Sequence, residues 1–474
     1  MDVAIGLEIH VQLATKSKLF CGCSAEYFGA APNSLTCPVC LGLPGTLPVL
    51  NRRAVELTLR LALALGSEVQ PISSFDRKSY FYPDLPKGYQ ITQKQRPLAL
   101  GGALSFPGEA GEETVCVGEL HLEEDAGKLI HAGDRTLVDL NRSGIALLEI
   151  VTEPDLRSPH DARVFVQTLR MLLRHLKVSS GEMDKGALRC DANVSLVPDG
   201  GPPGCKTEIK NMNSTRAVER ALAAEAERQW DVLSRGQPVE HATYGWDEAR
   251  GTVVLQRTKE EAANYRHFPE PDLPPLEISS ELVRLMQGEL PELPQARLER
   301  WNRELGLSGK EGQALIAEPE RGEYFEEVVA ACDSPREAAN WLLTELLPLW
   351  TGIKPPVPAA GLGTLIRAVN DGVLSRTTGK SLLEQAVTTG ADLEQLVGSE
   401  EVRQLSDTAS LTKLAQETIS SHPQAAADYR SGRTQALGFL VGQAMRKVQG
   451  RADAARLRKL LARLLDEGAD PPAT

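Results

Sequence analysis

Residues Glu119–Asp155 read ELHLEEDAGKLIHAGDRTLVDLNRSGIALLEIVTEPD and contain nine Asp and Glu residues in 37 positions. Near each end of this stretch, charged residues alternate with mostly apolar ones, which is the period of a β-strand with one polar face. The ionisable side chains on these two polar faces are Glu119, His121, Glu123, Glu149 and Glu153. The stretch therefore predicts two strands that each present acidic groups on one side.

Carboxylates on neighbouring strands repel one another unless a cation lies between them. Oxygen-rich clusters suit Mg²⁺, which keeps part of its water shell and bridges to phosphate oxygens. One such strand alone is equally consistent with a solvated acidic edge, because charged residues are mostly exposed. The two strands together favour a metal and phosphate site.

The N-terminal segment DVAIGLEIHVQL predicts a further strand of the same kind. Its odd-numbered positions from Val3 to Leu13 are apolar, whereas Glu8, His10 and Gln12 lie on the other face. Glu8 and His10 are two residues apart on that face, so they can share one cation. A lone histidine on a strand is usually structural, but beside the acidic strands this pair becomes a candidate ligand pair.

Two later segments alternate in the same way and add basic groups. In LRCDANVSL, Arg189, Asp191 and Asn193 share one face, and in KTEIKNMNS, Glu208 and Lys210 share the polar side. Five strands with one polar face fit a sheet with one packed and one working face better than a buried parallel sheet. Mixed acid and base on that face suit Mg²⁺–ATP, with carboxylates on the metal and Lys or Arg on the phosphates. We expect an α+β protein whose N-terminal sheet is mixed or antiparallel.

The common nucleotide-binding loops are absent from the sequence. Gly379-Lys380-Ser381 resembles the end of a Walker A loop, but Leu374 stands where that loop needs glycine, and the surrounding pattern is helical. A glycine-rich dinucleotide fingerprint is also missing. If ATP is used, the sheet face and its metals must hold it.

Four cysteines form two closely spaced pairs. Cys21-Gly-Cys23 and Cys37-Pro-Val-Cys40 are separated by thirteen residues, and together they offer four thiolates for tetrahedral, structural zinc. The alternative is a loop with four reduced thiols and no metal. The other cysteines are scattered, and we expect them to be inert.

Phe75–Gln93 concentrates aromatic residues, Pro, Gly and basic residues, and we expect a long ordered loop there. Lys78, Lys87 and the tyrosines are candidates to face a nucleotide or an RNA end, because bases stack on such rings. A structural lid without ligand contacts is the alternative. Amphipathic helices are expected at Asn51–Gly66 and Ser158–Leu176.

The 474 residues suffice for two to four domains of about 100–200 residues. The net charge of −12 argues against a chain that coats nucleic acid indiscriminately. Neither a signal-peptide core nor an apolar run of 18 residues is present, so we expect a cytoplasmic protein without a membrane partner.

Proline-rich PEPDLPP is expected to close a first domain, 1–278. A helical linker domain, 279–398, and a helical tail domain, 399–474, are expected to follow. Glu401–Thr474 holds 11 Lys and Arg against 8 Asp and Glu, a balance of +3. Its last helix, expected at about 451–467, places Arg456, Lys459 and Arg463 near one face, which suits contacts with tRNA phosphates. A solvated helical surface is the favoured explanation when that segment is considered alone.

The motifs together resemble the GatB/GatE family, the B subunits (GatB) of tRNA-dependent amidotransferases, over the whole length. The matching segments are GLEIHVQL, SKLFCGC, CPVCLGLPGTLPVLN, KSYFYPDLPKGYQITQ, HLEEDAGK, VDLNRSGIALLEIVTEPDLRSP, LRCDANVSL, EIKNMNS, YRHFPEPDLPP and DYRSGRTQALGFLVGQAMRKVQG. The resemblance implies a sheet domain similar in fold to glutamine synthetase. It also implies a heterotrimer with an amidase A subunit and a small C subunit.

The activity implied is that of a carbon–nitrogen ligase with glutamine as the amido-nitrogen donor. ATP and Mg²⁺ serve to phosphorylate the side-chain carboxylate of Glu-tRNA(Gln) or Asp-tRNA(Asn), and ammonia delivered from the A subunit then displaces the phosphate. No glutaminase signature occurs in this chain, so ammonia must come from a partner.

The resemblance implies that the Mg²⁺ ligands are Glu8, His10, Glu123, Glu124 and Glu149. The expected catalytic groups are Glu8, His10, Glu124, Glu149 and Lys78. Contacts with the nucleotide or the acceptor end are expected from Arg189, Asp191, Asn193 and Lys210. The four paired cysteines match family members that hold zinc, and the tail matches the domain that holds the tRNA elbow.

Two other classes of function stay open. A non-catalytic, zinc-stabilised tRNA-binding scaffold explains the cysteines and the basic tail but not the carboxylates; ATP consumption separates it from the enzyme. A free-standing amino-acid–ammonia ligase related to glutamine synthetase explains the carboxylates but needs no tail, so a requirement for tRNA excludes it.

Overall fold

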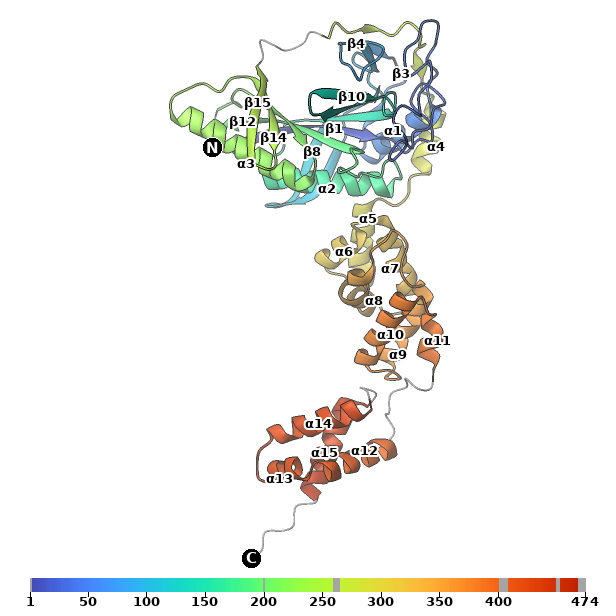
Figure 1. Cartoon of the computed structure of the whole chain (residues 1–474), viewed down its shortest axis with the longest axis vertical. Helices are drawn as coiled ribbons and strands as arrows, with labels where there is room; N and C mark the ends of the chain where they lie inside the picture. The colour runs from blue at the N-terminus through green and yellow to red at the C-terminus, as the bar shows by residue number, and fades with distance from the viewer. Residues whose placement is uncertain (1, 199–200, 259–264, 400–407, 449–451, 468–474) are drawn as a thin grey trace, which may run out of the picture. The chain divides into compact units, whose positions relative to one another are not determined.

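The computed structural model describes residues 2–198, 201–258, 265–399, 408–448 and 452–467. The chain divides into two compact units, Met1–Pro294 and Gln295–Thr474 (Figure 1). The first contains a large sheet and helices, and the second is helical, so the expected α+β class is confirmed. Among the helices in the described ranges, none has both the length and the apolar character that a membrane crossing requires.

A ten-stranded mixed sheet forms the centre of the first unit. Its strands are β1 (Asp2–Gln12), β2 (Glu68–Val69), β6 (Ala99–Leu100), β7 (Ala103–Gly108), β8 (Gly111–Glu124), β11 (Ala146–Thr152), β12 (Leu188–Val197), β13 (Thr207–Met212), β14 (Ala242–Asp247) and β15 (Thr252–Thr258). Their order is β15-β14-β13-β12-β1-β11-β8-β6-β2, with β7 paired to β8. Only β13 and β14 pair in parallel. The five strands with an expected polar face are therefore consecutive neighbours, β13-β12-β1-β11-β8.

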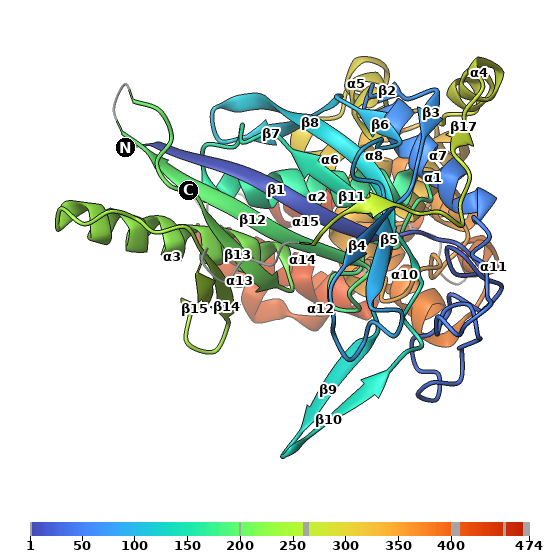
Figure 2. The same ribbon diagram turned by 90° about the horizontal axis from the view of Figure 1, so that it is seen from above.

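Helices cover the apolar face of this sheet. They are α1 (Arg52–Ala64), α2 (Pro159–His175) and α3 (Thr215–Ser234), and Figures 1 and 2 show α2 and α3 along the sheet. Ile5, Leu7 and Ile9 of β1 lie in one buried core with residues of all three helices. The side chains of Asn51 and Ser158 cap α1 and α2, so both expected helices are confirmed. With one face packed, the opposite face of the sheet is left for polar groups.

The prediction of a long loop at Phe75–Gln93 is wrong, because this segment contains two strands. β4 (Asp76–Ser79) pairs with β5 (Tyr89–Thr92) and with β16 (Phe268–Pro269). The guanidinium of Arg77 lies 4.2 Å from the centre of the Tyr89 ring and donates to Glu270 at 2.7 and 2.9 Å. One partner of β4, the strand β16, comes from far along the chain, and four-residue strands carry little periodic signal, so the local sequence did not reveal these strands.

Two further pairs of strands complete the first unit. β9 (Lys128–Ala132) and β10 (Arg135–Asp139) form a hairpin, which projects from the sheet in Figure 2. β3 (Ile72–Ser73) pairs with β17 (Leu276–Glu277), and α4 (Ser280–Gly288) follows β17.

The first unit continues beyond the expected boundary at 278. α4 contacts α1, and Met286 is buried in the same core as α1. The division into 1–278, 279–398 and 399–474 stays a prediction, and residues 400–407, at the second of its boundaries, lie outside the described residues.

The second unit consists of helices. They are α5 (Pro294–Arg300), α6 (Gly309–Ile316), α7 (Pro319–Cys332), α8 (Pro335–Trp341), α9 (Ala359–Asn370), α10 (Arg376–Thr389), α11 (Leu393–Gly398), α12 (Thr408–Ser421), α13 (Pro423–Arg430), α14 (Gln435–Lys447) and α15 (Ala454–Glu467). Short π-helical turns at Trp301–Leu305 and Leu342–Leu346 and a 3₁₀ turn at Leu347–Leu349 extend two of them.

Particular contacts explain two parts of this unit. Glu326 of α7 accepts hydrogen bonds from Arg297 at 3.1 Å and from the indole of Trp301 at 2.8 Å, which joins α7 to α5 and the turn after it.

The segment Gly379-Lys380-Ser381 lies inside α10, and Lys380 forms an ion pair with Glu345 at 2.7 Å, so this segment is no phosphate-binding loop.

Candidate active site

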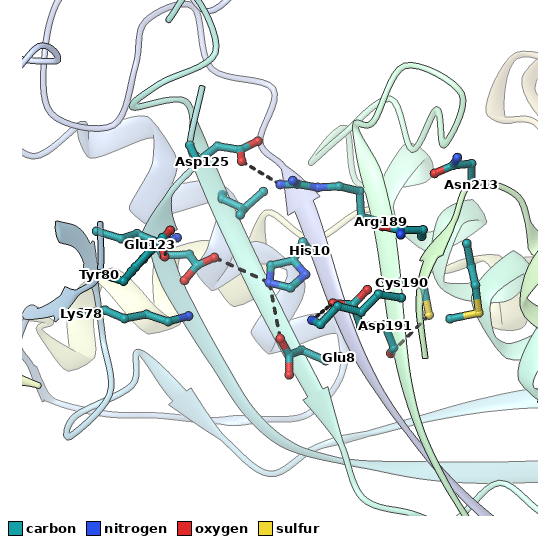
Figure 3. A pocket seen from close by; sticks show the side chains of 16 residues that line it. Glu8, His10, Lys78, Tyr80, Glu123, Asp125, Arg189, Cys190, Asp191 and Asn213 are labelled. Carbon is teal, nitrogen blue, oxygen red and sulfur yellow. Dashed lines mark hydrogen bonds and ion pairs between the residues drawn. The ribbon is translucent and has the colours of Figure 1, made fainter. Parts of the chain in front are cut away.

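A cavity of about 340 Å³ opens on the polar face of the sheet, where β1, β8, β12 and β13 meet the hairpin β4–β5 (Figure 3). Its charged and polar lining consists of Glu8, His10, Lys78, Tyr80, Gln90, Glu123, Asp125, Arg189, Asp191, Lys210, Asn211 and Asn213. Figure 3 shows side chains from these strands converging around the ring of His10.

The register of the sheet places His10 at the centre of this group. His10 stands opposite Glu149 on β11 and opposite Arg189 on β12, and Glu149 stands opposite His121 on β8. His10 Nε2 and His121 Nε2 each lie 3.3 Å from the same oxygen, Glu149 Oε2. Four consecutive strands therefore contribute one row of ionisable groups across the sheet.

Carboxylates surround His10 in two overlapping sets. Its Nε2 lies 3.7 Å from Glu8 Oε1 and 3.7 Å from Glu123 Oε1. Potential ligand atoms lie within 4.8 Å of one another in the set His10, Glu123 and Glu149 and in the set Glu8, His10 and Asp191. The two sets share the imidazole, so one small region of the sheet offers oxygen and nitrogen donors on both sides of it.

The chemistry of these donors fits a divalent cation. Glu123 is only 2% exposed, and its sole partner among the ion pairs of the described residues is His10. Burial raises the pKa of Glu123, and the charge of Glu149 raises it further. The pKa of Glu8 is raised for the same two reasons, burial having the larger effect and the charge of Glu149 the smaller one. A cation between these carboxylates would remove both penalties.

The histidines and Glu149 favour one another's charged forms. Burial acts to lower the pKa of His10, but the hydrogen bond to Glu149 and the charge of Glu123 outweigh it and raise that pKa to about 9. Burial acts to raise the pKa of Glu149, but hydrogen bonds with His10 and His121 hold it well below its usual value. Glu149 is thus the carboxylate kept ionised at the centre of the cluster.

Basic groups stand beside the carboxylates. Arg189 Nη2 donates to Asp125 Oδ1 at 2.9 Å, while its buried Nε has no hydrogen-bond partner. Lys210 Nζ lies 2.5 Å from Asp191 Oδ2. Lys78 forms no ion pair with any described residue, and its Nζ lies 5.0 Å from the centre of the Tyr265 ring. These cations give the cavity a mixed charge, of the kind that suits a metal ion together with phosphate groups.

The structure brings most of the expected site residues together, but not all of them. The cavity lining includes Glu8, His10, Lys78, Glu123, Arg189, Asp191 and Lys210, and Glu149 joins them through His10. Asn193 is absent from the lining; it stands opposite Gly6 and Glu208, further along β12.

Glu124 does not reach this cavity, because consecutive residues of β8 point to opposite sides. It forms an ion pair with Lys87, and Glu124 Oε1 accepts from the backbone N–H of Ile91 at 2.9 Å. It lines a separate cavity with Cys21 and Cys40. The structure thus places Glu124 away from the groups with which it was expected to bind Mg²⁺.

Several residues of the site were not selected from the sequence. They are His121, Asp125, Gln90, Asn211, Asn213 and Cys190. His121 carried a usable signal, since it alternates with Glu119 and Glu123. Asn211 has a positive φ of 69° at an irregularity between β12 and β13, a conformation that the sequence pattern does not reveal.

The four paired cysteines do meet, in the segment between β1 and α1. Their sulfur atoms all lie within 4.8 Å of one another, with Cys40 buried and the other three partly exposed. Four thiol ligands at this spacing fit a tetrahedral metal such as zinc. A cluster able to hold a metal, expected from the sequence, is therefore confirmed.

The basic residues expected to contact tRNA lie on α15. Arg456, Lys459 and Arg463 are exposed there; Arg456 Nε lies 3.4 Å from Asp453, and Arg463 Nε 2.6 Å from Glu467. Arg451, the expected start of this helix, lies outside the described residues.

Glu123→Gln and Glu124→Gln should separate the two neighbouring carboxylates. We expect Glu123→Gln to weaken Mn²⁺ binding at least about 100-fold, because it removes a ligand beside His10. Glu124→Gln should leave Mn²⁺ binding unchanged and lower stability by about 3 kcal/mol, because it leaves the buried ammonium of Lys87 without its anion. Electron paramagnetic resonance of free Mn²⁺ and chemical denaturation measure the two effects. Equal losses of Mn²⁺ affinity in both variants would contradict this assignment.

The sequence matches two family models and is similar to several named proteins. Residues 3–284 match the model of the GatB/GatE catalytic domain, and residues 323–465 match the model of the GatB domain. Three similar proteins are each named as the B subunit of an aspartyl/glutamyl-tRNA(Asn/Gln) amidotransferase.

The protein from Thermomicrobium roseum is 48% identical over 98% of this chain and 99% of its own length. That from Moorella thermoacetica is 46% identical over 97% and 98%. That from Thermotoga maritima is 44% identical over 98% of each chain. The first family model covers more than half of the chain, and these relatives match it almost from end to end. The chain therefore belongs to the GatB/GatE family, whose catalytic-domain model spans the entire sheet that carries the His10 cluster.

Proposed function

We propose that this chain takes part in tRNA-dependent amidation as the subunit that activates the side-chain carboxylate of a mischarged tRNA. The observation that carries the proposal is the cluster of His10, Glu123 and Glu149 on the open face of the sheet, with Lys78, Arg189 and Lys210 beside it. The names of the relatives support the same process, since each is called a subunit of an aspartyl/glutamyl-tRNA amidotransferase.

The reaction has two steps. A carboxylate oxygen of the Glu or Asp side chain attacks the γ-phosphorus of ATP, the bond to the β-phosphate oxygen breaks, and ADP leaves. Ammonia then attacks the acyl carbon of the acyl phosphate, loses a proton, and inorganic phosphate departs with the former carboxylate oxygen. A bound Mg²⁺ would neutralise phosphate charge and supply no covalent chemistry.

The chain's own residues account for the requirements of both steps. His10, Glu123 and Glu149, with Glu8 and Asp191, would hold the cation. Glu123 and Glu149 are buried, which limits the access of water that would hydrolyse the acyl phosphate. The Glu149–His10 and Glu149–His121 contacts fix the donor atoms before substrate binds, which avoids reorganisation during transfer.

The cations would take up the phosphate charge. Lys78 has no ion-pair partner among the described residues, so it is free to bind the transferring phosphoryl group. Arg189 and Lys210 are held by Asp125 and Asp191 and would contact the remaining phosphates or the acceptor end. These cations favour the charge that spreads over the phosphoryl oxygens during transfer.

The proposal requires other components. The sequence contains no glutaminase signature, so ammonia is expected from an amidase A subunit in a cytoplasmic heterotrimer that also contains a small C subunit. Glutamine would then be the amido-nitrogen donor of the complex. Zinc at the four cysteines and a likeness of the sheet domain to glutamine synthetase are parts of the same proposal.

A tRNA-binding scaffold is the second candidate, favoured by the exposed basic side chains of α15 and by the cysteine cluster. The test supplies ammonium, Mg²⁺, ATP and Glu-tRNA(Gln) or Asp-tRNA(Asn) to the complex with its partners, without glutamine. We expect ADP and amidated tRNA in equal amounts. Binding of tRNA without ATP turnover on either substrate would favour the scaffold instead.

Replacing Arg456, Lys459 and Arg463 together with glutamine should weaken tRNA binding about tenfold and reduce the salt dependence of binding by about two to three phosphate contacts. Titrations at several salt concentrations measure both quantities. A control triple variant with an equal change in charge replaces three basic residues outside α15, namely Arg300 at the end of α5, Arg303 in the turn after it and Lys310 in α6. An equal loss in the control would show that net charge, rather than α15, governs binding.

A further inference from the structure

Lys18 is a fully buried lysine beside the cysteine cluster. Its side chain is 0% exposed, and its Nζ lies 3.6 Å from Cys40 Sγ and 3.4 Å from the carbonyl oxygen of Leu140. Its backbone N–H donates to the carbonyl of Cys23 at 3.0 Å, so main chain and side chain both contact the cysteine segment.

Burial of an ammonium group is costly unless an anion compensates it. No carboxylate of the described residues forms an ion pair with Lys18, although Glu124 lines the adjoining cavity and pairs with Lys87 instead. Leu140 offers only a neutral carbonyl. Of the two atoms of described residues that Nζ contacts, the sulfur of Cys40 is the one that becomes an anion when it binds a metal.

Charge balance leads to the same partner. Four thiolates around one divalent cation carry a net charge of −2, which a partly buried site must offset. One ammonium reduces that charge to −1 and donates an N–H···S bond to a ligand sulfur. Donors to ligand atoms of this kind stabilise metal sites and fix the orientation of their ligands.

Neighbouring residues confine the side chain of Lys18 to this position. Leu19 donates from its backbone N–H to the carbonyl of Gly144 at 2.8 Å, which closes the segment before β11 over the lysine. A Cβ atom at Gly144 would lie 3.6 Å from Lys18 Cδ and 3.4 Å from Cys40 Cβ. The side chain of Lys18 is therefore held between the cysteine cluster and the segment that precedes β11.

We infer that Lys18 is a positioning residue of the metal site formed by Cys21, Cys23, Cys37 and Cys40, where its ammonium serves as the fixed counter-charge and the hydrogen-bond donor to Cys40. Its second contact, with Leu140, links that site to the segment leading into β11. The inference depends on metal binding by the cysteines and is independent of the amidation reaction.

The test uses the full chain loaded with Co²⁺ in place of the native metal, because Co²⁺–thiolate bonds have strong charge-transfer absorption. Lys18→Met shortens the side chain by one atom, keeps its unbranched shape, and removes the charge and the donor. Lys16→Met is the matched control, since Lys16 lies two residues away in the same segment and is exposed.

We expect Lys18→Met to weaken Co²⁺ and Zn²⁺ binding about 10- to 100-fold in competition with a chelator. The thiolate-to-Co²⁺ absorption should move to longer wavelength, because the sulfur loses a hydrogen bond that lowers the energy of its lone pair. Lys16→Met should change neither quantity. Unchanged affinity and absorption in Lys18→Met would overturn the inference.

A measurement on the wild-type protein keeps the inference testable should Lys18→Met fold poorly. With ¹⁵N-labelled lysine side chains and Cd²⁺ bound, one ammonium signal should exchange slowly with water and shift when the metal is removed. A spectrum in which every lysine ammonium exchanges rapidly, or in which none responds to the metal, would overturn the inference, and so would failure of the wild-type chain to bind Zn²⁺, Co²⁺ or Cd²⁺.

Discussion

Glu149→Gln should reduce ATP turnover on mischarged tRNA by at least about 1,000-fold. The substitution keeps the shape of the side chain but removes the one carboxylate that both His10 and His121 hold at 3.3 Å. It also removes the negative charge that the hydrogen bonds with His10 and His121 stabilise. The variant thereby loses one candidate metal ligand of the set His10, Glu123 and Glu149. Steady-state release of ADP by the complex, at saturating ATP and Mg²⁺, measures the loss.

Glu153→Gln provides the control, because Glu153 follows the same strand and is exposed. It should retain turnover within about twofold of the wild type, since an exposed carboxylate outside the cavity stabilises no charge there. Binding of tRNA should persist in both variants. Turnover by Glu149→Gln close to that of the control would contradict the role given to the His10 cluster.

Cys37→Ser combined with Cys40→Ser should abolish metal binding and destabilise the first unit by at least about 3 kcal/mol. Residues 13–51 connect β1 to α1 across 39 positions without a helix or a strand of three or more residues. Loops of this length are rarely ordered by their own backbone. A metal bound by the four sulfur atoms, which lie within 4.8 Å of one another, would supply the cross-link that orders this one.

Elemental analysis measures the metal, and denaturation monitored by the near-ultraviolet signal measures stability. Cys116→Ser and Cys205→Ser, at two exposed cysteines, serve as controls and should change neither. Full metal content in the double variant would show that the cysteine cluster is not the metal site.

The strands and the polar face were predictable because alternation is a local property. Glu8, His10, Arg189, Asp191 and Lys210 follow period-2 patterns in their own segments, and the sheet aligns those segments side by side. What alternation does not provide is register. That Glu149 stands opposite both His10 and His121 depends on hydrogen bonds between strands far apart in the chain.

Glu124 shows the limit of composition as evidence. The run Glu123-Glu124-Asp125 contains three consecutive carboxyl groups, but the side chains of consecutive residues in a strand point to opposite faces of the sheet. Glu123 and Asp125 line the cavity, while Glu124 pairs with Lys87 behind it. The hairpin β4–β5 escaped prediction for another reason, since its stabilising partner Glu270 lies 193 residues from Arg77.

The most direct test of the central claim follows one oxygen atom. The complex receives Mg²⁺, ATP, ammonium and Glu-tRNA(Gln) or Asp-tRNA(Asn) with ¹⁸O at both oxygens of the side-chain carboxylate, and mass spectrometry analyses the phosphate released. Phosphorylation of the carboxylate predicts one ¹⁸O in each phosphate formed with amidated tRNA, and none of that product from Glu149→Gln. Unlabelled phosphate from a reaction that amidates the tRNA would contradict the account.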